Sequence, residues 1–210
     1  MDYFTIAAPI DTSFTEKRSE FIGYLSPVLT NDEAVAFINS VKAGHRKARH
    51  HVYAYILRDS NTSRYSDDGE PQGTAGVPVL EVLQKRGLTD VCCVVVRYFG
   101  GILLGGGGLV RAYSHSASIT CDAAQIRHMC ESTPLTLQMD YTLYGKVTNI
   151  LPKYGVLERN SDFGTDVLLE LTVRNEVLQA LQDELTEVSA GRIGIEAGVP
   201  GYADFSAVTG

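Results

Sequence analysis

The pattern of apolar and polar positions changes character near the middle of the chain. The longest apolar run, residues 91–96, has six members and is typical of a strand buried on both faces. Glycines follow at 100–101 and 105–108, and helical spacing of apolar residues starts at Leu109. The pattern predicts a buried strand, a glycine loop and a helix that runs from about Leu109 to His128.

The residues before this segment predict alternating strands and helices. Residues 10–28 have the pattern of two strands around a turn at 16–19, and residues 52–57 alternate like a half-buried strand. Thr30 and Glu33 form a capping box for a helix that ends at Gly44. A polar, turn-rich stretch at 58–73 precedes a predicted helix at 74–86, which Gly87 ends.

The last third of the chain has a cleaner pattern. It predicts a strand at 135–143, a short helix at 147–154, strands at 156–158 and 167–173, a helix from Asn175, and a strand at 193–197. This order, βαββαβ, is that of a ferredoxin-like unit. Residues 200–210 have no periodicity and are predicted to be a loose tail. We therefore predict an α+β protein with domains at 1–132 and 133–199 and a tail at 200–210.

The distribution of charge supports two units. The net charge is −7, but residues 1–132 hold 13 basic and 14 acidic residues, whereas residues 133–210 hold 5 and 11. All five histidines lie in the first part. The acidic second unit is therefore not expected to attract phosphate backbones by its overall charge.

Composition narrows the class of protein. With 44% hydrophobic and 20% charged residues, the chain has the composition of an ordinary globular protein. No apolar run approaches a membrane span, and the first residues lack the pattern of a signal peptide. The four cysteines, at 92, 93, 121 and 130, lack metal-ligand spacing. We expect a cytoplasmic protein with reduced thiols, no membrane partner, no metal and no cofactor.

The glycine loop is the first candidate site. A buried strand, a glycine loop and a helix start together favour an anion, because free N–H groups and the helix dipole face the ligand. The alternative is a tight turn that only brings the strand and the helix close together. The sequence excludes a Walker loop and lacks the acidic residue of a dinucleotide fold. The candidate residues of the loop are Gly100, Gly101, Gly105, Gly107 and Gly108.

Two polar clusters are further candidates. Arg49, His50 and His51 precede or open a strand, where adjacent side chains point to opposite faces, so the histidine pair does not predict a metal site. Three carboxylates, those of Asp67, Asp68 and Glu70, can bind a hard cation or act as acid and base. The alternative for them is a solvated acidic turn.

Basic and aromatic residues flank the glycine loop. Arg97 ends the buried strand, Arg111 lies in the first turns of the next helix, and Tyr98 offers a ring for base stacking. An ion pair between Arg97 and the acidic turn is the alternative to a ligand-binding role. In either case we expect the acidic turn, Arg97 and residues 100–108 to converge in space.

These stretches together resemble the IMPACT family, and the YigZ branch in particular. The first stretch is residues 48–51, Ala-Arg-His-His. The second is residues 66–71, Ser-Asp-Asp-Gly-Glu-Pro, followed by residues 73–76 and Pro78. The third is residues 97–113, which begin with Arg-Tyr-Phe-Gly-Gly and end at Tyr113. The resemblance implies a ribosomal-protein-type first domain like EF-G domain IV and a second domain like EF-G domain V. Leu103 departs from many relatives, which carry a lysine there. The extra N-terminal domain of the eukaryotic branch has no room in 210 residues, so its partner is not expected.

The resemblance implies a regulatory role in translation. Our hypothesis is a protein that binds RNA, the ribosome or a protein of the translation machinery, without a secure catalytic activity. The alternative is an enzyme that acts on a phosphorylated small molecule through the glycine loop, Arg97 and the acidic turn. A closed pocket that joins these clusters favours the enzyme, whereas a shallow charged face favours a macromolecule.

Overall fold

The structure is a computed structural model, and it describes residues 1–208. The chain is an α+β protein with antiparallel sheets, and it divides into two compact units. The first, here called the N-terminal unit, comprises Tyr3–Arg127. The second, the C-terminal unit, comprises Met1–Asp2 together with the chain from His128 onward.

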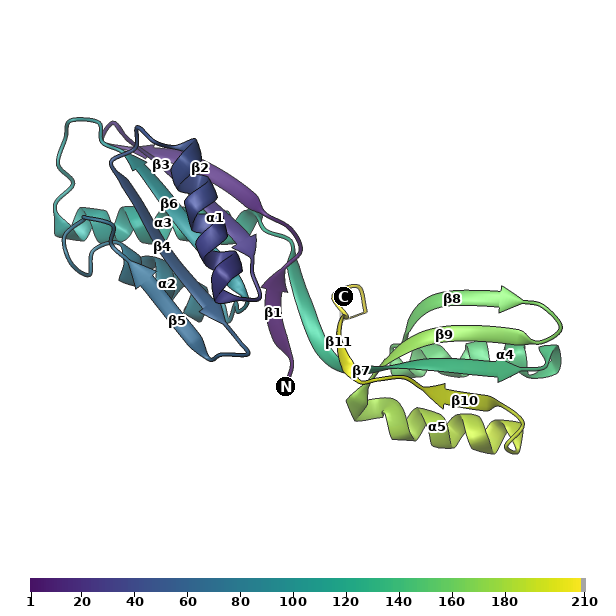
Figure 1. Ribbon diagram of the computed structural model, residues 1–210. Helices are drawn as coiled ribbons and strands as arrows, with labels where there is room; N and C mark the ends of the chain where they lie inside the picture. Colours follow the sequence, from purple (N-terminus) through teal and green to yellow (C-terminus); the bar gives the residue numbers. More distant parts are fainter. Residues whose placement is uncertain (209–210) are drawn as a thin grey trace. The chain divides into compact units, whose positions relative to one another are not determined.

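The N-terminal unit is built on a five-stranded antiparallel sheet (Figure 1). Its strands are, in spatial order, β2 (Ile10–Glu16), β3 (Ser19–Pro27), β6 (Val91–Tyr98), β4 (His50–Leu57) and β5 (Thr62–Ser66). Helix α1 (Asn31–Gly44) covers one face, and α2 (Gly76–Lys85) and α3 (Gly106–Ala123) cover the other. The short β1 (Tyr3–Ile6) adds a bridge from Phe4 to Leu88.

The central strand β6 is buried on both faces, as its apolar run predicts. Cys93 and Val95 belong to the core beneath α2 and α3, whereas Val94 and Val96 belong to the core beneath α1. Each side chain from Val91 to Val96 is fully buried. The continuous apolar run therefore arises because helices cover both faces of an antiparallel sheet.

Local signals set most boundaries in this unit. The Thr30 hydroxyl accepts a hydrogen bond from the Glu33 backbone N–H at 3.2 Å and starts α1, which confirms the predicted cap. Two larger differences from prediction occur in this unit. The polar stretch 58–73 contains the strand β5, and α3 ends at Ala123 instead of His128 because β7 begins at Ile126.

The C-terminal unit has the predicted βαββαβ order. Its sheet runs β10–β7–β9–β8, with two helices packed against it (Figure 1). The elements are β7 (Ile126–Met139), α4 (Tyr141–Ile150), a 3-10 turn (Leu151–Tyr154), β8 (Leu157–Phe163), β9 (Val167–Arg174), α5 (Asn175–Ser189), β10 (Gly194–Ala197) and β11 (Gly201–Asp204).

Several predictions for this unit were wrong in part. The predicted helix 147–154 begins earlier, as α4 at Tyr141, and its second half is the 3-10 turn Leu151–Tyr154. The predicted strand 156–158 is longer and ends at Phe163. The predicted strand 135–143 ends at Met139, because Asp140 caps α4 by accepting a hydrogen bond from the Thr142 N–H at 2.9 Å. The predicted loose tail contains β11, which pairs with residues 129–132 of β7. The last two residues of that tail, 209–210, lie outside the described part of the chain.

We predict that a fragment from residue 128 onward unfolds cooperatively and is more stable than a fragment from residue 133 onward. The longer fragment keeps residues 129–132, the partners of β11, whereas the shorter one leaves β11 unpaired. Urea denaturation followed by circular dichroism compares the two. Equal stability of both fragments would show that β11 contributes nothing to the unit.

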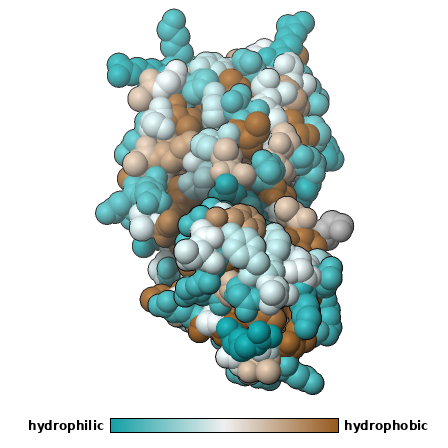
Figure 2. All heavy atoms as spheres, turned by 90° about the vertical axis from the view of Figure 1, so that its right-hand side faces the viewer, coloured by the Kyte–Doolittle hydropathy of each residue, from teal (hydrophilic) through white to brown (hydrophobic). Residues whose placement is uncertain are grey.

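Within the described residues, no helix is both long and apolar enough to cross a membrane. Figure 2 shows hydrophilic and hydrophobic residues interspersed over the face that is turned to the viewer.

Candidate functional site

Strand register brings three side chains together at one end of the sheet. Arg97 on β6 lies opposite Phe21 on β3 and opposite His50 on β4. Arg97 has the same parity along β6 as Cys93 and Val95, so its side chain faces α2 and α3. The end of β6 therefore supplies a cation to this face of the sheet.

The acidic turn holds itself in place with its first carboxylate. Asp67 accepts hydrogen bonds from the N–H groups of Gly73, Ala75 and Gly76 at 2.9, 3.1 and 2.8 Å. Ala75, the residue before α2, has no side chain that can cap the helix. Asp67 thus caps α2 from nine residues upstream of Gly76.

The second carboxylate fastens the turn to β4 and α1. Asp68 accepts from the His51 N–H at 2.6 Å and from the Lys42 ammonium at 3.2 Å. Its carbonyl lies 2.8 Å from His50 Nδ1. Burial alone would raise the pKa of Asp68, but the His51 N–H and Lys42 outweigh burial and lower that pKa below its ordinary value of 3.8.

We predict that Asp68→Asn lowers the free energy of unfolding at neutral pH by about 1–2 kcal/mol. Because the folded-state pKa of Asp68 is depressed, its contribution is present above the unfolded pKa and disappears as pH falls through the folded pKa. The melting temperatures of wild type and variant should therefore converge as pH falls from about 5 to about 3. A constant difference across that range would rule out the carboxylate as its cause.

The third carboxylate, Glu70, faces inward and forms the centre of the site. Its Oε1 accepts hydrogen bonds from Arg97 Nη1 at 2.6 Å and from the Tyr113 hydroxyl at 2.8 Å. His50 Nε2 lies 3.8 Å from the same oxygen. The side chains of Glu70 and Arg97 are only 4% and 5% exposed. Burial, and then the Glu70 carboxylate, raises the pKa of Tyr113 well above its usual range, so its hydroxyl stays a donor.

Arg97 uses only part of its donor capacity on Glu70. Its Nη2 lies 3.4 Å from the Ser19 hydroxyl, and its buried Nε has no hydrogen-bond partner among the described residues. The guanidinium also lies 5.5 Å from the ring centres of both Phe21 and Phe99. The arginine is thus held rigidly between rings while one donor remains unused.

The glycines of the loop serve different purposes. Gly100 lies where a Cβ would overlap the carbonyl of Arg18, so close packing of backbones requires glycine there. Gly101 and Gly105 have positive φ angles of 83° and 73°. Gly107 is the second residue of α3 and has open space around it.

We predict opposite effects for two glycine substitutions. Gly100→Ala should destabilise the protein by about 1–3 kcal/mol, because the added methyl group displaces the Arg18 backbone. Gly107→Ala, the control, should stabilise it by about 0.5–1 kcal/mol, because alanine favours a helix and meets no neighbour. Chemical denaturation measures both, and equal effects would contradict the packing argument.

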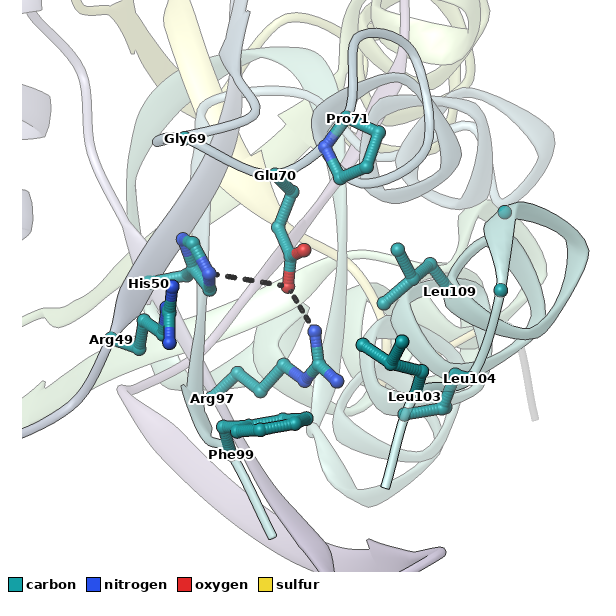
Figure 3. A pocket seen from close by; sticks show the side chains of 12 residues that line it. Arg49, His50, Gly69, Glu70, Pro71, Arg97, Phe99, Leu103, Leu104 and Leu109 are labelled. Carbon is teal, nitrogen blue, oxygen red and sulfur yellow. Dashed lines mark hydrogen bonds and ion pairs between the residues drawn. The ribbon is translucent and has the colours of Figure 1, made fainter. Parts of the chain in front are cut away.

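The clusters surround a cavity of about 370 Å³ (Figure 3). Glu70 lies between His50 and Arg97, while three leucines form the opposite wall, and Phe99 lies beside Arg97. This confirms that the acidic turn, Arg97 and the glycine loop converge. The lining residues are Arg49, His50, Gly69, Glu70, Pro71, Arg97, Phe99, Leu103, Leu104, Gly105, Gly106 and Leu109.

Helix α3 begins at the cavity, which Gly106 lines. Leu109 N–H bonds to the Gly105 carbonyl at 2.9 Å, whereas the N–H groups of Gly106, Gly107 and Gly108 have no partner among the described residues. No acidic side chain lies in the first turn of α3. A helix of this length with free N–H groups and a glycine start offers a positive end to the cavity.

Other predicted site residues lie elsewhere. His51 and Tyr98 face α1, where each contacts His45: His51 Nε2 lies 3.1 Å from the His45 carbonyl, and the Tyr98 hydroxyl lies 2.9 Å from His45 Nδ1. Arg111 and Gly108 line a separate cavity of about 250 Å³.

Sequence reasoning missed the apolar wall and the role of Tyr113. The wall consists of Leu103, Leu104 and Leu109, which stand within or directly after the glycine loop in the sequence. Tyr113 is fully buried, so it is unable to stack on a base and instead bonds to Glu70. In the sequence, Glu70 and Tyr113 are only two polar residues next to apolar segments, which does not indicate that they pair.

Comparison with protein families gives two matches along the chain. Residues 17–121 match the Impact N-terminal domain, and residues 137–192 match a domain of unknown function, DUF1949. The first match contains the whole cavity, and the second lies within the C-terminal unit.

Individual relatives cover nearly the full chain. The IMPACT family member YvyE of Bacillus subtilis is 37% identical over 203 residues, covering 96% of this chain and 94% of its own. The IMPACT family member YigZ of Escherichia coli is 36% identical over 194 residues, covering 91% of this chain and 95% of its own. A crystal structure described as that of a hypothetical protein is similar with a TM-score of 0.60 and 34% identity, over 94% of this chain and 98% of that one.

Proposed function

The chain belongs to the IMPACT family, and from this premise we propose that it acts in the regulation of translation by binding RNA phosphate, free or within the ribosome. Such a role places it in the cytoplasm. The proposal includes the likeness of its units to EF-G domains IV and V, both of which work on the ribosome.

The proposal rests on one observation, that two guanidinium groups line the same cavity as the first residue of helix α3. Arg49, Arg97 and Gly106 line the same cavity, and the N–H of Gly106 has no partner among the described residues. Charge-assisted bonds from arginine and free N–H groups at a helix start are the usual partners of phosphate. The Glu70 carboxylate offsets the charge of Arg97, whereas Arg49 has no carboxylate partner among the described residues, so Arg49 carries the uncompensated charge at the rim.

The aromatic residues near the cavity indicate how RNA would be contacted. Phe99 is 40% exposed, and Arg49 lies 6.0 Å from its ring centre. Tyr113 is buried and Tyr98 is bonded to His45, so Phe99 is the aromatic ring that lines the cavity. Most contacts are therefore expected to go to phosphate, with little reading of bases.

Co-sedimentation of the full chain with ribosomes tests the proposal. We expect the protein to sediment with ribosomes at low salt and to leave them after nuclease or high salt. Arg49→Ala should weaken this association, whereas Arg46→Ala, an exposed arginine outside the cavity lining, should not. Association that survives nuclease and salt would favour a protein of the translation machinery as partner, and failure to sediment would overturn the proposal.

A second candidate function is an enzyme that acts on a phosphorylated small molecule. The Glu70, Arg97 and Tyr113 cluster beside a cavity of about 370 Å³ favours it, since this volume lies in the range of small-ligand pockets. A rise in melting temperature with a phosphorylated metabolite, together with no RNA binding, would favour this enzyme. Loss of that rise in Arg49→Ala would place the metabolite in the cavity.

A further inference from the structure

We propose that Asp2, His128 and Cys130 bind a divalent transition-metal ion, for which Zn²⁺ has the best-matched chemistry. One ligand atom of each residue lies within 4.8 Å of the other two. All three residues belong to the C-terminal unit, so the site is independent of the cavity described above.

The distances suit a tetrahedral ion. His128 Nε2 lies 3.7 Å from Asp2 Oδ2 and 3.6 Å from Cys130 Sγ. Zinc bonds of about 2.3 Å to sulfur and about 2.0 Å to nitrogen or oxygen place neighbouring ligand atoms roughly 3.3–3.6 Å apart in a tetrahedron. An ion therefore fits between these atoms with only small side-chain adjustments.

The backbone holds two of the ligands in a fixed geometry. His128 and Cys130 alternate on β7, so their side chains leave the same face of the strand. Cys130 pairs with Ala203 of β11, and the His128 carbonyl accepts from the Phe205 N–H at 2.9 Å. The His128 N–H donates to the Ser206 hydroxyl at 2.8 Å. Pairing with the C-terminal segment thus pre-organises the site.

The donor set selects the class of metal. A thiolate with an imidazole favours Zn²⁺ and similar ions over Mg²⁺ or Ca²⁺, which prefer all-oxygen sites. The Asp2 carboxylate supplies a third ligand of the kind found in zinc sites. The sequence does not predict this site, because Asp2 stands at the start of the chain, far in sequence from His128 and Cys130.

Three protein ligands leave one position of a tetrahedral ion open. A cavity of about 170 Å³ adjoins the cluster and is lined by Asp2, Cys130 and Arg174 among others. The Arg174 Nε is buried and has no hydrogen-bond partner among the described residues. The fourth ligand is therefore water or a small anion that this guanidinium can contact.

Titration of the reduced, chelator-treated full chain with Co²⁺ tests the proposal. Cobalt bound to a thiolate gives a ligand-to-metal absorption band, which we expect to saturate at one ion per chain and to disappear when Zn²⁺ is added. Zn²⁺ should also raise the melting temperature. Absence of a saturable thiolate band would overturn the proposal.

Matched variants assign the ligands. Cys130→Ser should abolish the band, whereas Cys121→Ser, another buried free cysteine, should keep it. Cys130 is buried, so its substitution also changes core packing. Asp2 is exposed, and Asp2→Asn therefore gives a second test that does not depend on core packing. This variant should lower the affinity for Co²⁺ at least tenfold. Circular dichroism confirms that each variant is folded. A band that persists in Cys130→Ser, or unchanged affinity in Asp2→Asn, would show that another group binds the ion.

Discussion

Replacing Arg97 by alanine should lower the free energy of unfolding by about 3–5 kcal/mol, because it leaves the Glu70 carboxylate buried without its cation. The cost includes lost packing of the guanidinium between Phe21 and Phe99. Urea denaturation of the full chain, with the transition of the N-terminal unit followed separately, measures this change.

A double substitution separates the charge from the packing. Arg97→Met with Glu70→Gln removes both charges and keeps an acceptor for the Tyr113 hydroxyl. Its unfolding free energy should lie within about 1–2 kcal/mol of wild type, because a buried ion pair is close in stability to neutral groups of similar volume. If the double variant is as unstable as Arg97→Ala, the loss comes from packing alone.

An exposed ion pair provides the control. Arg86 pairs with Asp122 on the surface, where their side chains are 37% and 58% exposed. Arg86→Ala should therefore cost about 1 kcal/mol or less. A similar loss for Arg86 and Arg97 would contradict the role given to burial. The comparison also shows why Arg97→Ala is a poor probe of ligand binding, since it removes a fold-stabilising group.

Elements that depend on neighbouring residues were predictable from the sequence. Thr30 caps α1 through Glu33, three residues away, and the apolar run of β6 reflects the helices on both of its faces. The turn at Lys17 and Arg18 joins β2 to β3 as predicted. In each case the signal and the structure that it specifies lie within a few residues of each other.

Elements without a local signal were missed. The residues of β5 are largely exposed, so this edge strand has the polar pattern of a loop. Helix α3 ends at Ala123 without glycine or proline, and the residues after it do not mark the stop. Met139 and Tyr141 continue the alternation of β7, although Asp140 starts a helix between them.

For the candidate site, the sequence predicted only that the acidic turn, Arg97 and the glycine loop lie close together. The sequence indicated that the acidic turn 67–70 and Arg97 meet, because a buried arginine needs a carboxylate, and the structure shows that Glu70 is that carboxylate. It was unable to distinguish the three carboxylates of the turn, since the roles of Asp67 and Asp68 depend on backbone N–H groups brought close by folding. Strand alternation, in contrast, correctly separated the directions of His50 and His51.

If the cavity binds RNA, the affinity for RNA should fall steeply as the salt concentration rises. Adding or removing one charged side chain at the rim should change how steeply it falls. For single-stranded RNA the logarithm of the affinity falls against the logarithm of the salt concentration by roughly 0.7 for each phosphate contacted. Arg49→Ala should reduce the slope by about 0.7 and the affinity about 3- to 10-fold, because Arg49 is exposed and lines the cavity. Arg46→Ala is its matched control and should change neither.

Leu103 allows the opposite test. It lines the same cavity and is 82% exposed, so a lysine fits there without disturbing the core. Leu103→Lys should steepen the slope by about 0.7 and raise the affinity for RNA, because it adds one cation beside the start of α3. Fluorescence anisotropy with a labelled single-stranded RNA at two or more salt concentrations measures both variants. If neither substitution changes the slope while RNA still binds, the RNA lies on another surface and the cavity is left for a small molecule.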